Sequence, residues 1–328
     1  MPTPRDPDRR RISRVIDAAL SVAVAAVALS AAVLSVGASA HAAVTPKCFG
    51  AAARDPDRPC ENQRLRLTVT PTPDEATMIP NDDCVKERIT DALAQCSFGV
   101  PAEQAVETVV VVGDSHAQQW RPALAVVARA RLWRVLEVAI PHCLFSTALT
   151  GVGEPFTSWC PLWNHDVIEW LGAHPDLRTV FVSGNTLQSI VVAEGRSSFQ
   201  TRVDGYVSRW KQLPPSVERV IVIRDTPQDR VATYDCLRRA MTHQQPPGPA
   251  CAIRRRLALR TDPAAVAARL LGARNVSVAD LTPQFCDRRV CFPVVGGVLV
   301  RRDGDHLTRL FARTLGPFLL RRINQIAI

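Results

Sequence analysis

The run Val109-Val110-Val111-Val112 is the feature that most narrowly restricts the fold of this chain. Four consecutive β-branched apolar residues are typical of a central parallel strand that is covered on both faces. Gly113 follows the run, and glycine tolerates a sharp turn that a residue with a Cβ resists. From Ala117 to Arg131 apolar residues recur every three or four positions, which predicts a helix. The sequence therefore predicts a strand, a tight turn and a helix in succession.

The turn carries Ser115, and two residues near the other end of the chain suit it chemically. Ligands of open α/β sheets bind at the carboxyl ends of the strands, where this turn lies. Asp303 and His306 are one helical turn apart, so both can face the same way. A histidine can accept a serine proton, and a carboxylate can orient that histidine. We predict Ser115 as nucleophile, His306 as base and Asp303 as orienting acid; the alternatives are an N-cap role for Ser115 and Asp305 in place of Asp303.

The motif Gly113-Asp114-Ser115-His116 together with Asp303-x-x-His306 resembles the SGNH (GDSL-like) hydrolase superfamily. The wider match resembles the extracytoplasmic SGNH domains that are fused to, or work beside, integral-membrane sugar O-acyltransferases of acyltransferase family three. It extends roughly from Cys48 to the C-terminus. The residues that carry this narrower resemblance are Val112–Ala117, Gln119-Trp120, Pro122-Ala123-Leu124 and Asp305-His306-Leu307-Thr308.

The resemblance implies an oxyanion hole made by the backbone N–H of Ser115, a glycine backbone and an asparagine side chain. Asn185 is the candidate asparagine, although the Gly-x-Asn spacing of the family is replaced here by adjacent Gly184 and Asn185. The candidate glycine is Gly151, with Gly153 as the alternative. Beside the nucleophile, we predict that Asp114 braces the turn and that His116 either lines the pocket or is structural.

Alternating strands and helices predict a doubly wound α/β fold with a mainly parallel five-stranded sheet between two helical layers. The resemblance implies that this fold is of the SGNH or flavodoxin-like type. The predicted strands are 108–112, 134–140, 179–182, 217–223 and 275–278, and the predicted helices are 117–131, 163–173, 199–212, 263–271 and 305–323. Within 281–300 a hairpin is possible, and the insert 227–259 is expected to form a lid or a stapled loop.

Three segments are expected along the chain. Residues 1–42 are a signal peptide or a signal anchor, because a basic flank precedes an uncharged apolar run over about 18–40 that is long enough to span a bilayer. Residues 43–106 are an irregular, disulfide-stapled extension, with one short helix over 83–94, and residues 107–328 are the SGNH hydrolase-like domain. Both interpretations of the first segment export the remainder, which is then either secreted or held at the plasma membrane by one N-terminal helix.

Ten cysteines support export, because disulfides persist in oxidising compartments. Spacing does not fix connectivity, but the cysteines lie in close sequential pairs and we predict that neighbours bond. The alternative, a zinc site, lacks any Cys-x-x-Cys or finger-like histidine spacing, so we predict no metal. The predicted disulfides are Cys48–Cys60, Cys84–Cys96, Cys143–Cys160, Cys236–Cys251 and Cys286–Cys291.

The formal net charge of the chain is +9. The arginines are scattered, and no basic run alternates with aromatic residues as in nucleic-acid-binding proteins. We therefore predict no nucleic acid partner, and no cofactor. Some of Trp120, Trp159 and Trp163 could line a sugar site, although core packing suits at least two of them. The remaining histidines are interpreted as surface or structural residues: His142, His165, His174 and His243.

Together these features predict an exported serine-dependent acyltransferase that O-acetylates a cell-envelope polysaccharide or glycan through an acyl-serine. Two alternatives remain open: a carbohydrate acetylesterase, in which water resolves the acyl-serine, and a non-catalytic glycan-binding module. The resemblance further implies an acyl donor. Since this chain has a single apolar segment, either a separate integral-membrane acyltransferase is its partner or the chain uses another donor.

Overall fold

The computed structural model describes residues 45–328, apart from 92, 273–274 and 327–328. Its centre is a seven-stranded sheet in the order β1-β2-β4-β3-β5-β6-β8. Five neighbouring strands are parallel, and β2 and β1 extend one edge in antiparallel fashion. The strands are β1 Val85–Arg88, β2 Ala94–Gly99, β3 Glu107–Gly113, β4 Trp133–Ala139, β5 Thr179–Ser183, β6 Arg219–Ile223 and β8 Val276–Ala279.

The parallel strands confirm the predicted doubly wound α/β class. Taken in chain order, they lie in space as second, first, third, fourth and fifth, which is the flavodoxin-like arrangement. The first of them, β3, lies between β4 and β5, where the direction of winding reverses. Open sheets bind ligands at the carboxyl end of such a switch point. Ser115 follows β3 directly, so the topology places it at that position.

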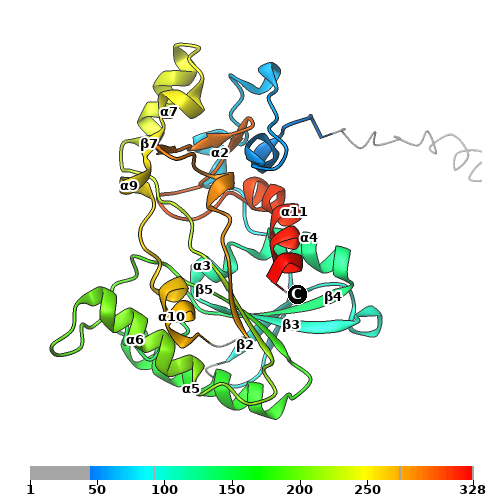
Figure 1. Cartoon of the computed structure of the whole chain (residues 1–328), viewed down its shortest axis with the longest axis vertical. Coiled ribbons are helices and arrows are strands. Elements are labelled where there is room, and N and C mark those ends of the chain that lie inside the picture. The colour runs from blue at the N-terminus through cyan, green and yellow to red at the C-terminus, as the bar shows by residue number, and fades with distance from the viewer. Residues whose placement is uncertain (1–44, 92, 273–274, 327–328) are drawn as a thin grey trace, which may run out of the picture. The chain divides into compact units, whose positions relative to one another are not determined.

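Helices cover both faces of the sheet (Figure 1). α4 and α11 pack together on one face, while α5, α6 and α10 cover the other. The bounds are α4 Arg121–Arg131, α5 Phe156–Ala173, α6 Ser198–Trp210, α10 Pro263–Leu271 and α11 Arg309–Ile326. Side chains of β3 alternate between the two layers: Val109 and Val111 join the α4–α11 side, and Val110 and Val112 join the other. This two-sided burial is the reason for the unbroken valine run.

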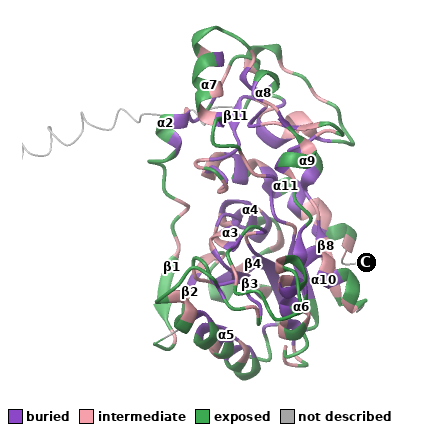
Figure 2. Cartoon of the chain, turned by 90° about the vertical axis from the view of Figure 1, so that its left-hand side faces the viewer, coloured by how far each residue is buried: buried purple, intermediate pink, exposed green. Residues whose placement is uncertain are grey.

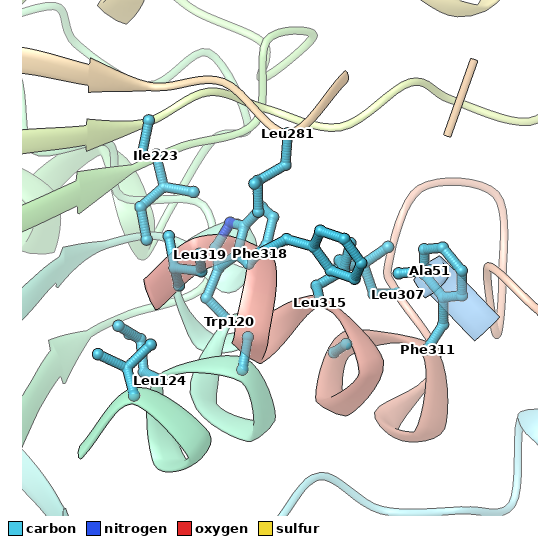
Figure 3. Packing of buried hydrophobic residues seen from close by; sticks show 14 of the residues in the cluster. Ala51, Trp120, Leu124, Ile223, Leu281, Leu307, Phe311, Leu315, Phe318 and Leu319 are labelled. Carbon is cyan, nitrogen blue, oxygen red and sulfur yellow. The ribbon is translucent and has the colours of Figure 1, made fainter. Parts of the chain in front are cut away.

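The nucleophile turn is followed by residues that pack in the core between α4, α11 and the sheet. Trp120 is fully buried there among Leu124, Leu315 and Leu319 (Figure 3). Its indole Nε1–H donates a hydrogen bond to Ser183 Oγ at 3.2 Å, at the end of β5. A buried tryptophan with its N–H satisfied fixes the helix that follows the nucleophile relative to the neighbouring strand.

Two local predictions are wrong in part. The single helix predicted over 117–131 is broken into α3 (Ser115–Gln118) and α4, because Pro122 has no N–H and suits the start of a new helix. The helix predicted over 83–94 does not form, and this stretch contributes the edge strand β1. Pairing with β2 and the Cys84–Cys96 disulfide outweigh the local helical preference, and the exposed charges of β1 are typical of a protected sheet edge.

A smaller layer lies beyond the carboxyl ends of the strands (Figure 1). It contains a third apolar cluster that includes Leu237, Ala240 and Leu299. Its two-residue strands β10 and β11 form a hairpin through Gly296-Gly297, where both residues have positive φ as a tight primed turn requires. Its elements are α2 Pro73–Ala76, α7 Thr233–Thr242, β7 Ile253–Arg254, α8 Pro247–Ala250, α9 Arg255–Ala258, β9 Val290–Cys291, β10 Val294–Val295 and β11 Val298–Leu299.

The ten cysteines are joined as the five neighbouring pairs that the sequence predicts, and Pro46–Ile328 forms one compact unit. The predicted division at residues 106 and 107 stays a prediction, although β1 and β2 continue the sheet across it. Figure 2 shows β3 and β4 buried at the centre and much of α7 exposed. The apolar segment over 18–40 lies outside the described residues, and within them no helix has both the length and the apolar character to cross a bilayer.

Candidate active site

The turn between β3 and α3 presents Ser115 at the edge of the sheet. Asp114 caps α3: one carboxylate oxygen accepts the His116 N–H at 2.8 Å, and the other accepts the Asn185 N–H at 2.9 Å. Asp114 is therefore a buried brace between the nucleophile turn and the end of β5, as predicted. Among the described residues no group accepts the backbone N–H of Ser115. That N–H is free to bind a developing oxyanion.

Gly113 makes this turn possible because a side chain would not fit there. An ideal Cβ on Gly113 would lie 1.9 Å from the carbonyl oxygen of Ser183, and its φ is +151°. We expect Gly113→Ala to lower the free energy of unfolding by about 3 kcal/mol or more. Gly172→Ala is the matched control, since it lies within α5 with open space around it and should be neutral or slightly stabilising. Chemical denaturation of both variants tests this, and equal stabilities would contradict the steric argument.

His306 lies against Ser115, and two carboxylates lie against His306. The distance from His306 Nε2 to Ser115 Oγ is 2.8 Å. On the other side of the ring, Nδ1 lies 3.0 Å from Asp303 Oδ2 and 3.0 Å from Asp305 Oδ1. The structure thus brings together all three residues of the predicted triad, and it also places the rival, Asp305, at the same ring nitrogen. An imidazole held in this way by carboxylates has its free nitrogen directed at the nucleophile.

The loop that carries these groups is fixed from two sides. Asp303 Oδ1 accepts the backbone N–H groups of Asp305 at 3.1 Å and of His306 at 2.7 Å. The hydroxyl of Tyr234, on α7, donates to the carbonyl of Asp303 at 2.7 Å. The N–H of Leu307 donates to the side chain of Gln119, one helical turn after Ser115, at 2.8 Å. The insert therefore positions the catalytic loop through Tyr234, a role that the sequence did not reveal.

His116 is fully buried behind the site and does not line the pocket. Its Nδ1 lies 2.6 Å from a carboxylate oxygen of Asp225, which follows β6. Its Nε2 faces Asp305 Oδ2 at 3.6 Å, within ion-pair range but beyond a hydrogen bond. The His116 and His306 rings meet edge to face with centroids 5.1 Å apart. No motif in the sequence indicated Asp225, although it follows a central strand, where sites of this fold form.

The charges of these groups depend on one another. Burial by itself lowers the pKa of His306, but its hydrogen bonds with Asp303 and Asp305 outweigh burial and raise the pKa to about 9. Burial also acts to lower the pKa of His116, and the ion pair with Asp225 reverses this and raises it to about 10. The neighbouring imidazoles of His116 and His306 hold the pKa of the Asp305 carboxyl well below its usual range. The Asp303 and Asp305 carboxylates are thus ionised at neutral pH, and the protonated form is favoured at both His116 and His306.

The structure separates the two candidate oxyanion residues. The Asn185 side chain lies beside the triad, where its Nδ2 donates to Asp305 Oδ2 at 3.1 Å and its Oδ1 accepts the Leu187 N–H at 2.8 Å. Gly151 is exposed, and its N–H is donated to the Ser189 carbonyl at 2.9 Å. That bond occupies the group that an oxyanion would need. Asn185 and Gly151 remain proposals as oxyanion residues, and the geometry favours Asn185.

A small cavity of about 120 Å³ opens beside the nucleophile, lined by Ser115, His306, Gln118 and Arg302. A larger cavity of about 290 Å³ lies at the opposite edge of the sheet, beside Glu107, and no histidine lines it. We place the chemistry in the smaller cavity because the nucleophile and the base meet there.

Ligand atoms of His116, Asp305 and His306 lie within 4.8 Å of one another, which is the one such grouping among the described residues that could hold a cation. Each of the three side chains already contacts another in the chain of ion pairs described above. These contacts account for the grouping, so we assign no metal to it.

The other candidates from the sequence lie outside the site. Trp120 and Trp163 are fully buried core residues, whereas Trp159 is exposed on α5. His142 packs edge to face on Phe156, and His174 contacts the carbonyl oxygen of Trp170. None of the histidines outside the site, among the described residues, belongs to a metal-like cluster.

Several solved structures are similar to parts of this chain, each at low sequence identity. No curated protein sequence matches the chain. Among solved structures, the periplasmic domain of the lipopolysaccharide acetyltransferase of Salmonella ser. Paratyphi A is similar, with 12% identity, coverage of 70% of this chain and 90% of that one, and a TM-score of 0.49. An esterase of Pyrobaculum calidifontis has 11% identity, coverage of 77% and 88%, and a TM-score of 0.34. An esterase of Rhizomucor miehei has 10% identity, coverage of 81% and 89%, and a TM-score of 0.35.

The family match is more decisive than these superpositions. Residues 82–321 match the family described as the SGNH domain fused to AT3 domains, and this range contains Ser115, His306 and both carboxylates beside His306. An SGNH domain with a serine–histidine–carboxylate arrangement makes the protein an acyltransferase or an esterase. The chain belongs to the family of SGNH domains that occur fused to AT3 domains.

Proposed function

We propose that the protein transfers an acetyl group to a hydroxyl of a cell-envelope glycan through an acyl-serine intermediate. The observation that carries this proposal is the 2.8 Å contact between Ser115 Oγ and His306 Nε2, with carboxylates at the opposite ring nitrogen. A serine is a weak nucleophile unless an adjacent base accepts its proton. His306 is placed to do so, and the free N–H of Ser115 supports the oxyanion that forms.

The proposed reaction has two balanced halves. Ser115 Oγ attacks the acyl carbonyl while its proton moves to His306 Nε2, and the donor leaves with that proton. The acceptor hydroxyl then attacks the acyl-serine, gives its own proton to His306 and takes the acyl group, and the proton returns to Ser115 Oγ. If water replaces the glycan in the second half, the same residues make the protein an acetylesterase.

The size of the cavity favours a short acyl group. Its volume of about 120 Å³ is well below the ~300–1,000 Å³ that is typical of sites for drug-sized ligands. A long acyl chain would not fit beside Ser115, whereas an acetyl group would. Because domains of this family occur fused to AT3 domains, we propose that a separate AT3-type membrane protein delivers the acyl group. Five disulfides are typical of the oxidising compartments outside the cytoplasm, where such a glycan would be modified.

The experiment supplies p-nitrophenyl acetate as donor and a mixture of neutral and acidic oligosaccharides as acceptors to the oxidised full-length protein. We expect release of p-nitrophenol together with acetylated oligosaccharide, detected by mass spectrometry as a gain of one acetyl group. Arg302 lines the cavity, so acidic oligosaccharides are included among the acceptors. Acetate as the sole product with every acceptor would replace the transferase by the esterase, and no product with any donor would contradict both.

A further inference from the structure

The groups behind His306 form a continuous chain from the nucleophile to the end of β6. Ser115 contacts His306, His306 contacts Asp305, Asp305 faces His116, and His116 contacts Asp225, with the successive distances 2.8, 3.0, 3.6 and 2.6 Å. A serine–histidine–carboxylate triad requires only the first three groups. The His116–Asp225 pair is fully buried and is additional to it.

The contacts of Asp225 stabilise its ionised carboxylate. Its carboxylate accepts the backbone N–H groups of Thr186 and Thr226, each at 2.8 Å, in addition to His116. Its own N–H donates to Asp262, the N-cap of α10, at 2.9 Å. Hydrogen bonds from N–H groups stabilise an ionised carboxylate inside a protein, which offsets the loss of hydration. A histidine held against such an anion stays protonated, so the interior holds a fixed cation beside Asp305.

The charge of His116 reduces the repulsion between the two carboxylates beside His306. Asp303 and Asp305 both lie 3.0 Å from the same Nδ1 atom, and two carboxylates that close together repel each other. The other charged or titratable groups that face His116 are Asp114 at the nucleophile turn and His306, while Tyr206 on α6 and Asp262 face Asp225. Among the described residues, two cations besides His306 lie against these carboxylates. Arg302 Nε lies 3.5 Å from Asp303 Oδ2, and His116 faces the Asp305 oxygen that is not bonded to His306.

We propose that His116 and Asp225 form a positioning dyad, which holds Asp305 beside His306 and offsets its charge so that both carboxylates orient one base. The proposal rests on the proposed roles of Ser115 and His306 as nucleophile and base. It assigns a function to the histidine of the Gly113–His116 motif, which touches neither substrate nor nucleophile. A positive charge at this distance also keeps His306 from binding its proton too tightly, so more of the base is neutral near pH 7.

The test measures how the His306 imidazole titrates in the full-length protein with histidine labelled by ¹³C and ¹⁵N. Removing an anion should lower the His306 midpoint, and removing a cation should raise it. We therefore expect Asp305→Asn to lower the midpoint by about one pH unit and His116→Asn to raise it by about one pH unit. Asp225→Asn should act like His116→Asn, because a buried histidine without its anion loses its proton. If these residues only supported the fold, their variants would not shift the His306 midpoint in opposite directions.

The same shifts should appear in kinetics with p-nitrophenyl acetate. The rising limb of kcat/KM against pH should move in the same direction as the midpoint, so His116→Asn should lose about tenfold at pH 7 and lose less at pH 9. The matched control is His174→Asn, whose ring contacts a backbone carbonyl at the C-terminal end of α5. It should leave both the His306 midpoint and kcat/KM unchanged.

The outcomes separate this proposal from the proposed function. Shifts of the same sign in all variants, or no shift in variants that unfold at the wild-type temperature, would overturn the dyad. Shifts of opposite sign without turnover in the wild type would support the dyad and overturn the catalytic proposal. If His116→Asn fails to fold, Asp225→Asn and the half-exposed Asp305→Asn decide the question, since neither changes the size of a side chain.

Discussion

Turnover of p-nitrophenyl acetate is expected to fall by about 10⁴-fold or more in Ser115→Ala, with little change in stability. The hydroxyl is the atom that would form the acyl intermediate, and removing a nucleophile leaves only the assistance of binding and oxyanion contacts. Ser115 is partly exposed at the site, and its hydroxyl forms a hydrogen bond with His306. The measurement is kcat/KM of the purified protein, together with mass spectrometry of the intact protein after a rapid acid quench. Wild type should carry one added acetyl group, and the variant none.

Ser158→Ala is the matched control for this experiment. Ser158 is an exposed serine on α5 whose hydroxyl donates only to Glu154, at 2.9 Å, within one helical turn. Its loss should leave kcat/KM and the acetylated species unchanged. Turnover retained in Ser115→Ala, or an acetyl group found on another residue, would contradict the assignment of the nucleophile.

The sheet could be predicted from the sequence because its strands are buried on both faces. A short run of β-branched residues such as Val109–Val112 favours a buried strand when a glycine and a helical pattern follow it. The same reasoning fails at the sheet edge. Val85–Arg88 is polar and short, so nothing in its pattern distinguishes a strand from a turn of helix. Its conformation depends on pairing with β2 and on a disulfide, which are contacts between segments and not local preferences.

The site divides in the same way. Ser115 lies in the short motif Gly113–His116, and His306 lies in the motif Asp303-x-x-His306, so both residues could be predicted from local sequence. Asp225 has no motif, because its role arises only when β6 is laid beside β5 and the C-terminal loop folds over the strand ends. The one available indication was an acidic residue two positions after a buried parallel strand. Such a residue lies at the edge of the sheet where open α/β folds place their sites.

The shared role of Asp303 and Asp305 leads to the other large expected effect. His306 Nδ1 carries one proton and has a carboxylate oxygen 3.0 Å away on each side. Either carboxylate alone can keep the ring in the tautomer that directs Nε2 at Ser115. We expect Asp303→Asn to reduce kcat/KM by about 10- to 100-fold and Asp305→Asn by about tenfold, each compared at its own pH optimum. The double variant should lose about 10³- to 10⁴-fold, close to the effect of leaving a triad histidine without its acid.

The comparison of single and double variants decides whether one acid or two serve the base. Asp303 also accepts two backbone N–H groups of the loop, so its asparagine variant loses part of the support of His306 as well as a charge. For this reason its single effect should be the larger. If the two acids substitute for each other, the double variant loses more than the product of the single effects. If Asp303 alone is the acid, Asp305→Asn is nearly silent, the double variant equals Asp303→Asn, and the positioning of Asp305 by His116 has no part in catalysis.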